Sequence, residues 1–181
     1  KRNLKNNQNE SENPELCLIV DDSSSTNGQI MRQQLNASIA LLETARKTRK
    51  PASLIVFGSH VTTLIKPGQE YQRMEMIIAS LQSQSGGTRL APALTEALRF
   101  IPNNGEKMAT VVFTDSYLFD IEESISLIPR LMSAGPVALF CTEDRLDDSL
   151  VGSLKKLKKS PAIIQVAPNT QLVDAALRIL L

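Results

Sequence analysis

Five side chains with oxygen donors, spread over three segments of the chain, are the residues best suited to chemistry. They are two carboxylates and three hydroxyls: Asp21, Ser23, Ser25, Thr88 and Asp115. Asp21, Ser23 and Ser25 alternate with single residues, and in a compact loop this spacing turns all three oxygens toward one point. Such oxygen ligands suit a hard divalent cation. The residues therefore predict a metal site without histidine or cysteine, completed by water and a group from outside the chain.

Two of the three segments directly follow apolar runs that are typical of strands, LCLIV (16–20) and ATVVFT (109–114). Open α/β sheets bind their ligands beyond the carboxyl ends of their strands, so both segments should meet at that edge. Thr88 comes after Gly86 and Gly87, and glycine allows the backbone bend that would bring Thr88 to the same point. We therefore expect all five residues at one edge of a sheet.

Strand-like and helix-like patterns alternate from residue 16 to the end of the sequence. We expect strands at 16–21, 52–57, 60–66, 108–114, 137–141 and 162–167. We expect helices at about 27–48, 70–82, 89–101, 120–133, 145–158 and 170–181. This alternation predicts a mostly parallel sheet with helices on both faces. The Gly58–Ser59 turn is too short for a parallel crossover, so the second and third strands should be antiparallel.

Taken together, the five residues resemble the metal-ion-dependent adhesion site (MIDAS) of a von Willebrand factor A (vWA) domain. In that family the first strand ends in Asp-x-Ser-x-Ser, which Asp21, Ser23 and Ser25 match. Thr88 matches a threonine in a glycine-rich loop before a helix, and Asp115 matches an aspartate after the fourth strand. The resemblance implies Mg²⁺, with Mn²⁺ or Ca²⁺ as alternatives, held by these residues directly or through water. It also implies that an Asp or Glu of a partner protein completes the coordination.

The resemblance extends over residues 16–181 and implies one domain. The implied fold is a Rossmann-like three-layer α/β sandwich, with a six-stranded, mostly parallel sheet of order 3-2-1-4-5-6, strand 3 antiparallel, and helices on both faces. Residues 1–15 are polar and rich in Asn, and we expect them to form a disordered linker. Because the chain begins at Lys1 rather than Met, we expect it to be a segment or a processed form of a longer protein.

Three positions depart from the family's pattern without removing a ligand. Ser24 stands where glycine is usual, Thr26 where methionine is frequent, and Ser116 where glycine often follows the last aspartate. Asp22 adds a negative charge beside the site. We expect partner contacts from six residues around the ion: Asp22, Ser24, Thr26, Gly87, Arg89 and Ser116.

Composition narrows the class of function. The 181 residues carry a formal net charge of +1 and no Trp, which does not suggest a nucleic-acid partner. No apolar run reaches the ~18–20 residues of a membrane span, so we expect no membrane insertion. Cys17 and Cys141 lie in apolar runs on strands that should not be neighbours, which predicts two buried thiols rather than a disulfide. Free thiols are consistent with a reducing compartment, and we favour the cytoplasm or an organelle.

Other α/β classes fit less well. A phosphoacceptor receiver domain needs an Asp after its third strand and a Lys after its fifth, where this chain has Lys66–Pro67 and Cys141–Thr142. A haloacid dehalogenase phosphatase needs a second Asp where Ser23 stands, and a dinucleotide fold needs a glycine-rich turn after the first strand. A purely structural interpretation makes Asp21 and Ser25 caps of the first helix, and Asp115 or the better placed Asp120 a cap of the helix near 120.

The favoured function is metal-dependent protein binding without catalysis. Intracellular vWA domains often accompany AAA+ ATPases, as in magnesium chelatase-like and MoxR-like systems, and the polar segment before this domain fits that arrangement. Extracellular adhesion, a metal-independent scaffold and a metal-dependent hydrolase subunit are the alternatives. The sequence offers no general base or nucleophile beyond the candidate ligands. Metal-dependent binding predicts association that chelation abolishes, a scaffold predicts association that survives it, and an enzyme predicts turnover.

Overall fold

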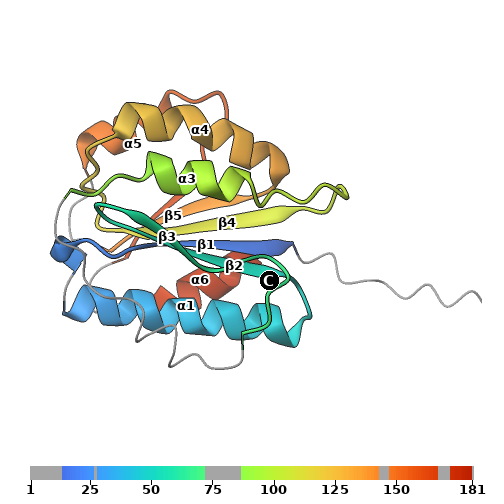
Figure 1. Ribbon diagram of the computed structural model, residues 1–181. Coiled ribbons are helices and arrows are strands. Elements are labelled where there is room, and N and C mark those ends of the chain that lie inside the picture. The colour runs from blue at the N-terminus through green and yellow to red at the C-terminus, as the bar shows by residue number, and fades with distance from the viewer. Residues whose placement is uncertain (1–13, 27, 72–86, 143–146, 167–171, 181) are drawn as a thin grey trace, which may run out of the picture.

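Six strands form one sheet through the middle of the molecule (Figure 1). The computed structural model describes residues 14–26, 28–71, 87–142, 147–166 and 172–180. The strands are β1 (Glu15–Asp21), β2 (Ala52–Phe57), β3 (Val61–Ile65), β4 (Met108–Thr114), β5 (Val137–Cys141) and β6 (Ala162–Gln165). Their order is β3-β2-β1-β4-β5-β6; the β2–β3 pair is antiparallel and the other pairs are parallel. The predicted sheet order and hairpin are therefore confirmed.

Helices cover both faces of this sheet. They are α1 (Gln29–Lys47), α3 (Ala91–Leu98), α4 (Ile121–Ala134), α5 (Asp148–Lys155) and α6 (Leu172–Leu180). Helices α1 and α6 pack together on one face, while α4 contacts both α3 and α5 on the other (Figure 1). The result is the three-layer sandwich that the alternation of elements predicts.

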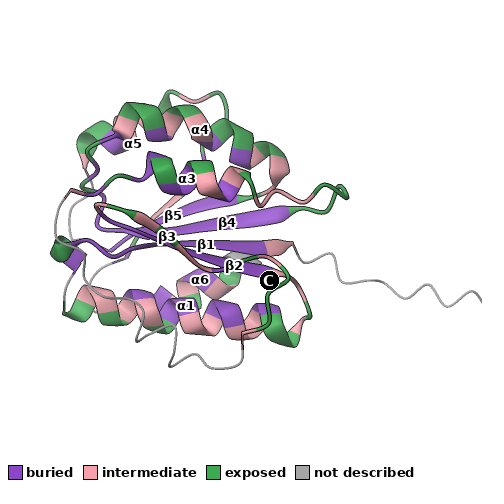
Figure 2. Cartoon of the chain, viewed as in Figure 1, coloured by how far each residue is buried: buried purple, intermediate pink, exposed green. Residues whose placement is uncertain are grey.

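Each face of the sheet has its own hydrophobic core. Along β1, Leu16, Leu18 and Val20 pack with side chains of α1 and α6, whereas Cys17 and Ile19 pack with side chains of α3 and α4. Successive side chains of a strand point to opposite faces, so a strand covered on both sides is apolar at every position. Figure 2 shows β1, β2, β4 and β5 as almost continuously buried. This two-sided packing fixes where the strands end, and so where the polar residues that follow them lie.

Several element boundaries differ from the prediction for local reasons. Helix α1 begins at Gln29 rather than at 27, because Gly28 has a φ of 75°, outside the helical range. Helix α5 begins at Asp148, and the side chain of Asp147 accepts two backbone N–H groups of its first turn. The expected linker ended one residue too late, since Glu15 already pairs in β1; residues 1–13 lie outside the described chain.

The expected helix at 89–101 is shorter in the structure, and the strands at 60–66 and 162–167 end earlier. Of the helix expected at 170–181, residues 172–180 are helical, and the other positions lie outside the described residues. Of the helix expected at 70–82, residues 70 and 71 are not helical. The rest of that segment lies outside the described residues. These differences move ends by a few residues and leave the order of elements unchanged.

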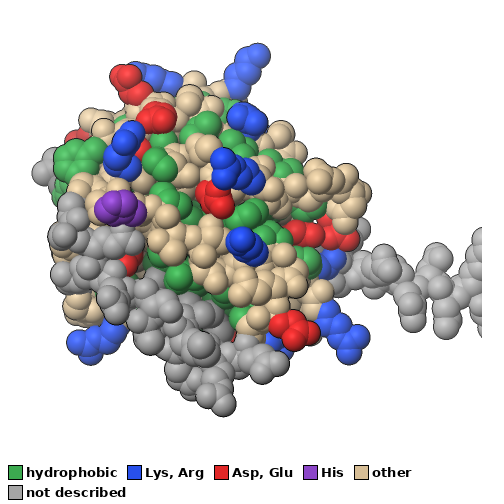
Figure 3. All heavy atoms as spheres, in the orientation of Figure 1, with side chains coloured by type: hydrophobic (Ala, Val, Ile, Leu, Met, Phe, Trp, Pro, Cys, Tyr) green, Lys and Arg blue, Asp and Glu red, His purple; other side chains and the backbone are tan. Residues whose placement is uncertain are grey.

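The two cysteines are buried free thiols, as expected. Cys17 lies on β1 and Cys141 on β5, with β4 between them. Burial raises the pKa of both thiols to about 12, so they stay protonated near neutral pH. On the face drawn in Figure 3, acidic and basic side chains are interspersed. Within the described residues, no helix has both the length and the apolar character to cross a membrane.

Candidate metal centre

The two predicted carboxylates come from neighbouring strands. Asp21 is the last residue of β1, and Asp115 follows Thr114, the last residue of β4. Because β1 and β4 are paired in parallel, both strands end at the same edge of the sheet. Asp21 and Asp115 are both fully buried. The β1–β4 pairing thus brings together two acidic residues that are 94 positions apart in the sequence numbering, 21 and 115.

Hydrogen bonds hold the Asp21 carboxylate in a fixed orientation. Its Oδ1 accepts the backbone N–H of Ser23 at 3.0 Å, and its Oδ2 accepts the Thr114 hydroxyl at 2.9 Å. The second bond joins β1 to β4 at the site itself. The role of Thr114 was not predicted from the sequence, although its position directly before Asp115 at a strand end was a signal.

The loop after β1 folds its serines toward each other. The Oγ atoms of Ser23 and Ser25 lie 2.9 Å apart, at the start of the 3₁₀ helix η1 (Ser24–Thr26). The Thr26 hydroxyl donates to the backbone carbonyls of Asp21 at 3.2 Å and Ser23 at 2.8 Å, which closes the loop. The alternating spacing therefore brings the two serine hydroxyls together, which is one part of the predicted arrangement.

The loop carrying Thr88 is tied to the loop carrying Asp115. Thr88 is almost fully buried, and its carbonyl oxygen accepts the backbone N–H of Phe119 at 3.0 Å. The backbone N–H of Arg89 donates to the carbonyl of Gly58, at the end of β2, at 3.3 Å. These bonds hold the Thr88 loop over the same edge of the sheet.

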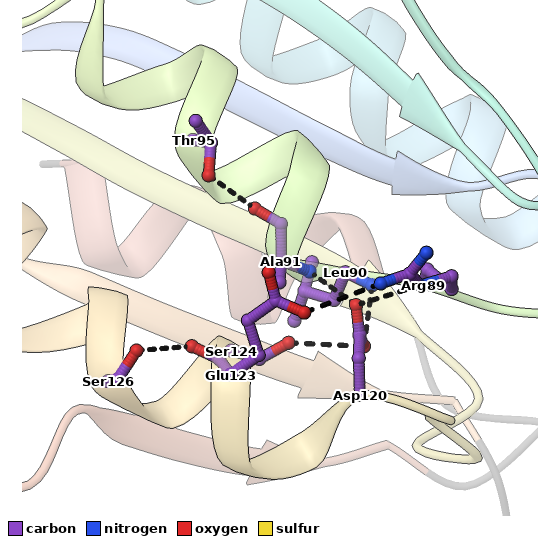
Figure 4. A network of polar contacts seen from close by, with 8 residues as sticks. All are labelled: Arg89, Leu90, Ala91, Thr95, Asp120, Glu123, Ser124 and Ser126. Carbon is purple, nitrogen blue, oxygen red and sulfur yellow. Dashed lines mark hydrogen bonds and ion pairs between the residues drawn. The ribbon is translucent and has the colours of Figure 1, made fainter.

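The side chain of Asp120 makes further bonds between the loop after Asp115 and the loop after Thr88 (Figure 4). Its two carboxylate oxygens accept the backbone N–H groups of Leu90 and Ala91, both at 2.9 Å. It also accepts the Ser124 hydroxyl at 3.2 Å, and the Arg89 guanidinium lies 3.9 Å away. A negative charge on the orphan N–H groups at a helix N-terminus is favourable. Asp120 thus stabilises the start of α3 at Ala91, three residues after Thr88.

The hydrogen bonds also test the alternative interpretation, in which these residues only cap helices. Helix α1 has Gly28 at its N-cap and no side-chain cap, so Asp21 and Ser25 do not cap it. Asp120 does occupy the N-cap position of α4, but its side chain makes no capping bond to α4. Its carboxylate serves α3 instead. The interpretation of Asp21, Ser25 and Asp115 as helix caps is therefore wrong, whereas Asp120 has the expected N-cap position but directs its carboxylate to α3.

One carboxylate oxygen of the site has no partner. Asp115 Oδ1 accepts the backbone N–H of Tyr117 at 3.0 Å, whereas its Oδ2 is buried without a hydrogen bond among the described residues. The same holds for Oδ1 of Asp22, which is also buried. A buried, unpartnered carboxylate oxygen is costly unless a cation satisfies it.

The pKa values of Asp21 and Asp22 also indicate that negative charge at this site is not compensated. Burial raises the pKa of Asp21 from 3.8 to about 6; hydrogen bonds from Ser23 lower it, and the negative charge of Asp115 raises it. Burial and the charge of Asp21 raise the pKa of Asp22 to about 6. The site is therefore short of positive charge, which is the condition that a cation relieves.

The six residues expected to contact a partner differ in exposure. Asp22, Thr26 and Ser116 are buried, so they lie beneath the surface. Ser24 and Arg89 are exposed, and Gly87 is half-buried. No group of three or more His, Cys, Asp or Glu side chains suited to a metal occurs within the described residues. The candidate set differs from such groups because three of its five members are hydroxyls.

The chain belongs to the von Willebrand factor type A domain family, whose model matches residues 16–117. No curated protein matches the chain. Domains of this family are generally protein-interaction modules rather than enzymes.

Solved structures share the fold over nearly the whole chain. The SpRpn10 VWA domain has 14% identity and a TM-score of 0.69, covering 92% of this chain and 95% of that one. An aerotolerance-related membrane protein from Bacteroides fragilis, with multiple mutations to serines, has 18% identity and a TM-score of 0.71, covering 92% and 98%. Manganese-loaded TRAP protein from Plasmodium vivax has 16% identity and a TM-score of 0.69, covering 93% and 72%. At these identities the likeness concerns the fold.

Proposed function

We propose that this vWA domain binds a divalent cation, Mg²⁺ in the first place, and through it a carboxylate of a partner protein. The ligands would be Asp21, Ser23, Ser25, Thr88 and Asp115. The observation that carries the proposal is the buried Oδ2 of Asp115, which lacks a hydrogen-bond partner among the described residues. It lies beside a second buried carboxylate, Asp21, whose pKa is raised.

The donor set fits such an ion. Carboxylate and hydroxyl oxygens are the ligands that Mg²⁺ and Mn²⁺ accept, and the two negative charges match a dication. When bound, the ion supplies a positive charge with room for a ligand from outside. The hydrogen bonds from Ser23 and Thr114 hold the Asp21 carboxylate in place, so little ordering is needed on binding.

Partner recognition follows from the same chemistry. An Asp or Glu side chain of the partner would take the open position, and the exposed Ser24 and Arg89 lie beside it. We propose that the domain binds its partner and catalyses no reaction. The manganese-loaded TRAP structure, which has the same fold, makes Mn²⁺ a suitable probe ion.

The biological setting that we propose is a larger assembly with an AAA+ ATPase of the magnesium chelatase-like or MoxR-like kind, in the cytoplasm or an organelle. Two buried free thiols and no disulfide among the described residues support a reducing compartment. Association with such an ATPase that chelation abolishes would support this setting. Association that survives chelation would favour a scaffold.

The test is a Mg²⁺ titration followed by amide NMR, taken to roughly 10 mM, above the weakest protein Ca²⁺ sites. The key variant is Asp115→Asn, which keeps the shape of the side chain and an oxygen for the Tyr117 N–H while removing the charge. The matched control is Glu122→Gln, an exposed carboxylate in the first turn of α4.

We expect saturable shifts in residues 21–26, 87–89 and 115–117 of the wild type and of the control. In Asp115→Asn the same titration should leave these amides unshifted. If the wild type shows no shifts, or if Asp115→Asn shifts as the wild type does, the proposed metal centre is refuted.

A further inference from the structure

Two aromatic side chains stand out at the rim of the candidate metal centre. Tyr117 is 53% exposed and Phe119 is 81% exposed, and they are the exposed large hydrophobic side chains of the described chain. A single exposed apolar residue needs no explanation, but a cluster marks an interaction site. Both rings belong to the loop that follows Asp115. Their role was not predicted from the sequence, although two aromatic residues in the short segment DSYLFD were a signal.

The loop holds both rings outward by alternation. Ser116, Leu118 and Asp120 are buried, and the residues between them point to solvent. The Ser116 hydroxyl accepts the backbone N–H of Asp147 at 3.2 Å. The backbone N–H groups of Tyr117 and Phe119 are bonded to Asp115 and to the Thr88 loop, as described above. The exposure of the rings is therefore imposed by a fixed backbone.

The Phe119 ring also lies directly over the loop that leads to Thr88. A Cβ placed on Gly87 would lie 2.9 Å from Cδ2 of Phe119, so the ring and this glycine are in close contact. Only a residue without a side chain permits that approach. The apolar surface of Phe119 is thus continuous with the loop that carries a proposed metal ligand.

A groove of about 700 Å³ adjoins this ring, between the start of α4 and helix α5. Leu118 and Phe119 are apolar residues of its lining, and Glu122 and Glu123 are acidic ones. Arg89 also lines it, but its guanidinium is 3.4 Å from Glu123 and 3.9 Å from the carboxylate of Asp120. The Arg89 charge is thereby offset (Figure 4). The groove combines an apolar wall with an acidic rim.

We propose that Tyr117, Phe119 and this groove form a second contact for the partner whose carboxylate binds at the metal centre. The occupant is a protein segment that carries an Asp or Glu, a large apolar side chain beside it, and a Lys or Arg for the acidic rim. This inference rests on the proposed function, because the metal-bound carboxylate sets where the segment begins. It adds what the metal centre alone does not supply, which is selection among partners that all offer a carboxylate.

The test uses displayed ten-residue peptides with Glu fixed at the centre and the other positions random, selected on the wild-type domain in Mn²⁺. One selected peptide is then synthesised with and without its apolar residue. Binding to this pair is measured for the wild type, for Tyr117→Ser/Phe119→Ser, and for the matched variant Tyr117→Phe/Phe119→Tyr. The affinity of each protein for Mn²⁺ alone is measured in parallel.

We expect the selection to enrich large apolar residues beside the Glu and Lys or Arg beyond them. The serine variant should lose about tenfold or more in peptide affinity, as for aromatic hot spots, with unchanged Mn²⁺ affinity. The matched aromatic variant should bind as the wild type does. The peptide without its apolar residue should bind the wild type and the serine variant equally weakly.

Other outcomes overturn the inference in distinguishable ways. Mn²⁺ binding with Glu peptides of no apolar preference leaves the proposed function standing and refutes the aromatic contact. Weakened Mn²⁺ binding in the serine variant shows that the rings support the Thr88 loop and do not contact a partner. Peptide binding that persists in chelator refutes the metal-anchored partner altogether. A dimer of the wild type that the serine variant dissolves shows that a second copy of the chain covers the rings.

Discussion

Replacing Asp120 with alanine should destabilise the domain by about 2–4 kcal/mol. The carboxylate accepts the backbone N–H groups of Leu90 and Ala91, and both of these residues are fully buried. Leaving a buried donor without an acceptor costs about 1–3 kcal/mol each, and losing a helix cap typically costs about 1 kcal/mol. Asp120 lines the groove, so water that enters after the substitution should offset part of the cost.

Two further variants calibrate this magnitude. Asp120→Asn keeps one carbonyl oxygen and so one of the two bonds, and it should lose roughly half as much. Glu123→Ala removes only the 3.4 Å ion pair with Arg89, in which both side chains are more than half exposed. Such surface pairs contribute about 0–1 kcal/mol, so this variant serves as the matched control.

The assay is urea unfolding in chelator at pH 7.5, followed by far-ultraviolet circular dichroism. Because Asp120 holds the N-terminus of α3 close to Thr88, the alanine variant should also bind Mn²⁺ more weakly than the control does. If Asp120→Ala loses less than about 1 kcal/mol, or no more than Glu123→Ala, then the two backbone bonds do not fasten the loops. The account of how Thr88 is positioned would then be wrong.

Other substitutions test the loops and the sheet through urea unfolding. Arg49→Gly should raise stability by about 0.5 kcal/mol, because the φ of 56° at this exposed residue favours glycine; an unchanged midpoint would show that this backbone is not strained. Ser116 also has a positive φ of 75°, but Ser116→Gly removes the acceptor of the Asp147 N–H and should therefore gain less than Arg49→Gly. Gly135→Ala should cost about 2 kcal/mol or more, because a Cβ there would overlap a backbone carbonyl oxygen of β4. Gly152→Ala, in α5 with nothing within 4 Å, should instead gain about 0.5–1 kcal/mol, and the opposite ranking would contradict the packing. In chelator, Asp21→Asn should stabilise the domain by up to about 2 kcal/mol at pH 7.5, which is the net of two effects. Burial raises the carboxyl pKa from 3.8 to about 6, so removing the charge gains up to about 3 kcal/mol at about 1.4 kcal/mol per pKa unit; losing one of the two hydrogen bonds that Asp21 accepts costs about 1 kcal/mol. A raised pKa means that the folded protein binds this proton more tightly, so the gain should be absent below about pH 4 and should grow up to about pH 6; a gain independent of pH would refute the cause.

The fold was largely predictable because its signals are local. An apolar run such as LCLIV must be buried on both faces, and alternation of such runs with helical periodicity leads to a covered parallel sheet. A two-residue turn at Gly58–Ser59 permits only an antiparallel neighbour. Element ends were less predictable, because they depend on single backbone and side-chain choices. Gly28 delays the start of α1, and the Asp147 side chain sets the start of α5.

In the candidate site too, contacts between residues close in sequence were predictable, and contacts between distant segments were not. Asp21, Ser23 and Ser25 are close in sequence, and hydrogen bonds within their loop join Asp21 to Ser23 and Ser23 to Ser25. Asp120 was expected to act on the helix that it precedes, which is the local choice. Its carboxylate instead bonds the start of α3, about thirty residues earlier, because α3 and α4 pack side by side.

The sequence by itself determined which oxygen donors this domain has and that they follow strands meeting at one edge. Those features depend on residue type and on short-range periodicity, which the chain carries locally. Only the tertiary structure decided which atoms are satisfied and which surfaces are exposed. The packing of the loops leaves Asp115 Oδ2 buried without a partner among the described residues and turns Phe119 outward. The physical reason is that hydrogen-bond partners and burial come from segments far apart in the sequence, so they are determined only when those segments pack together.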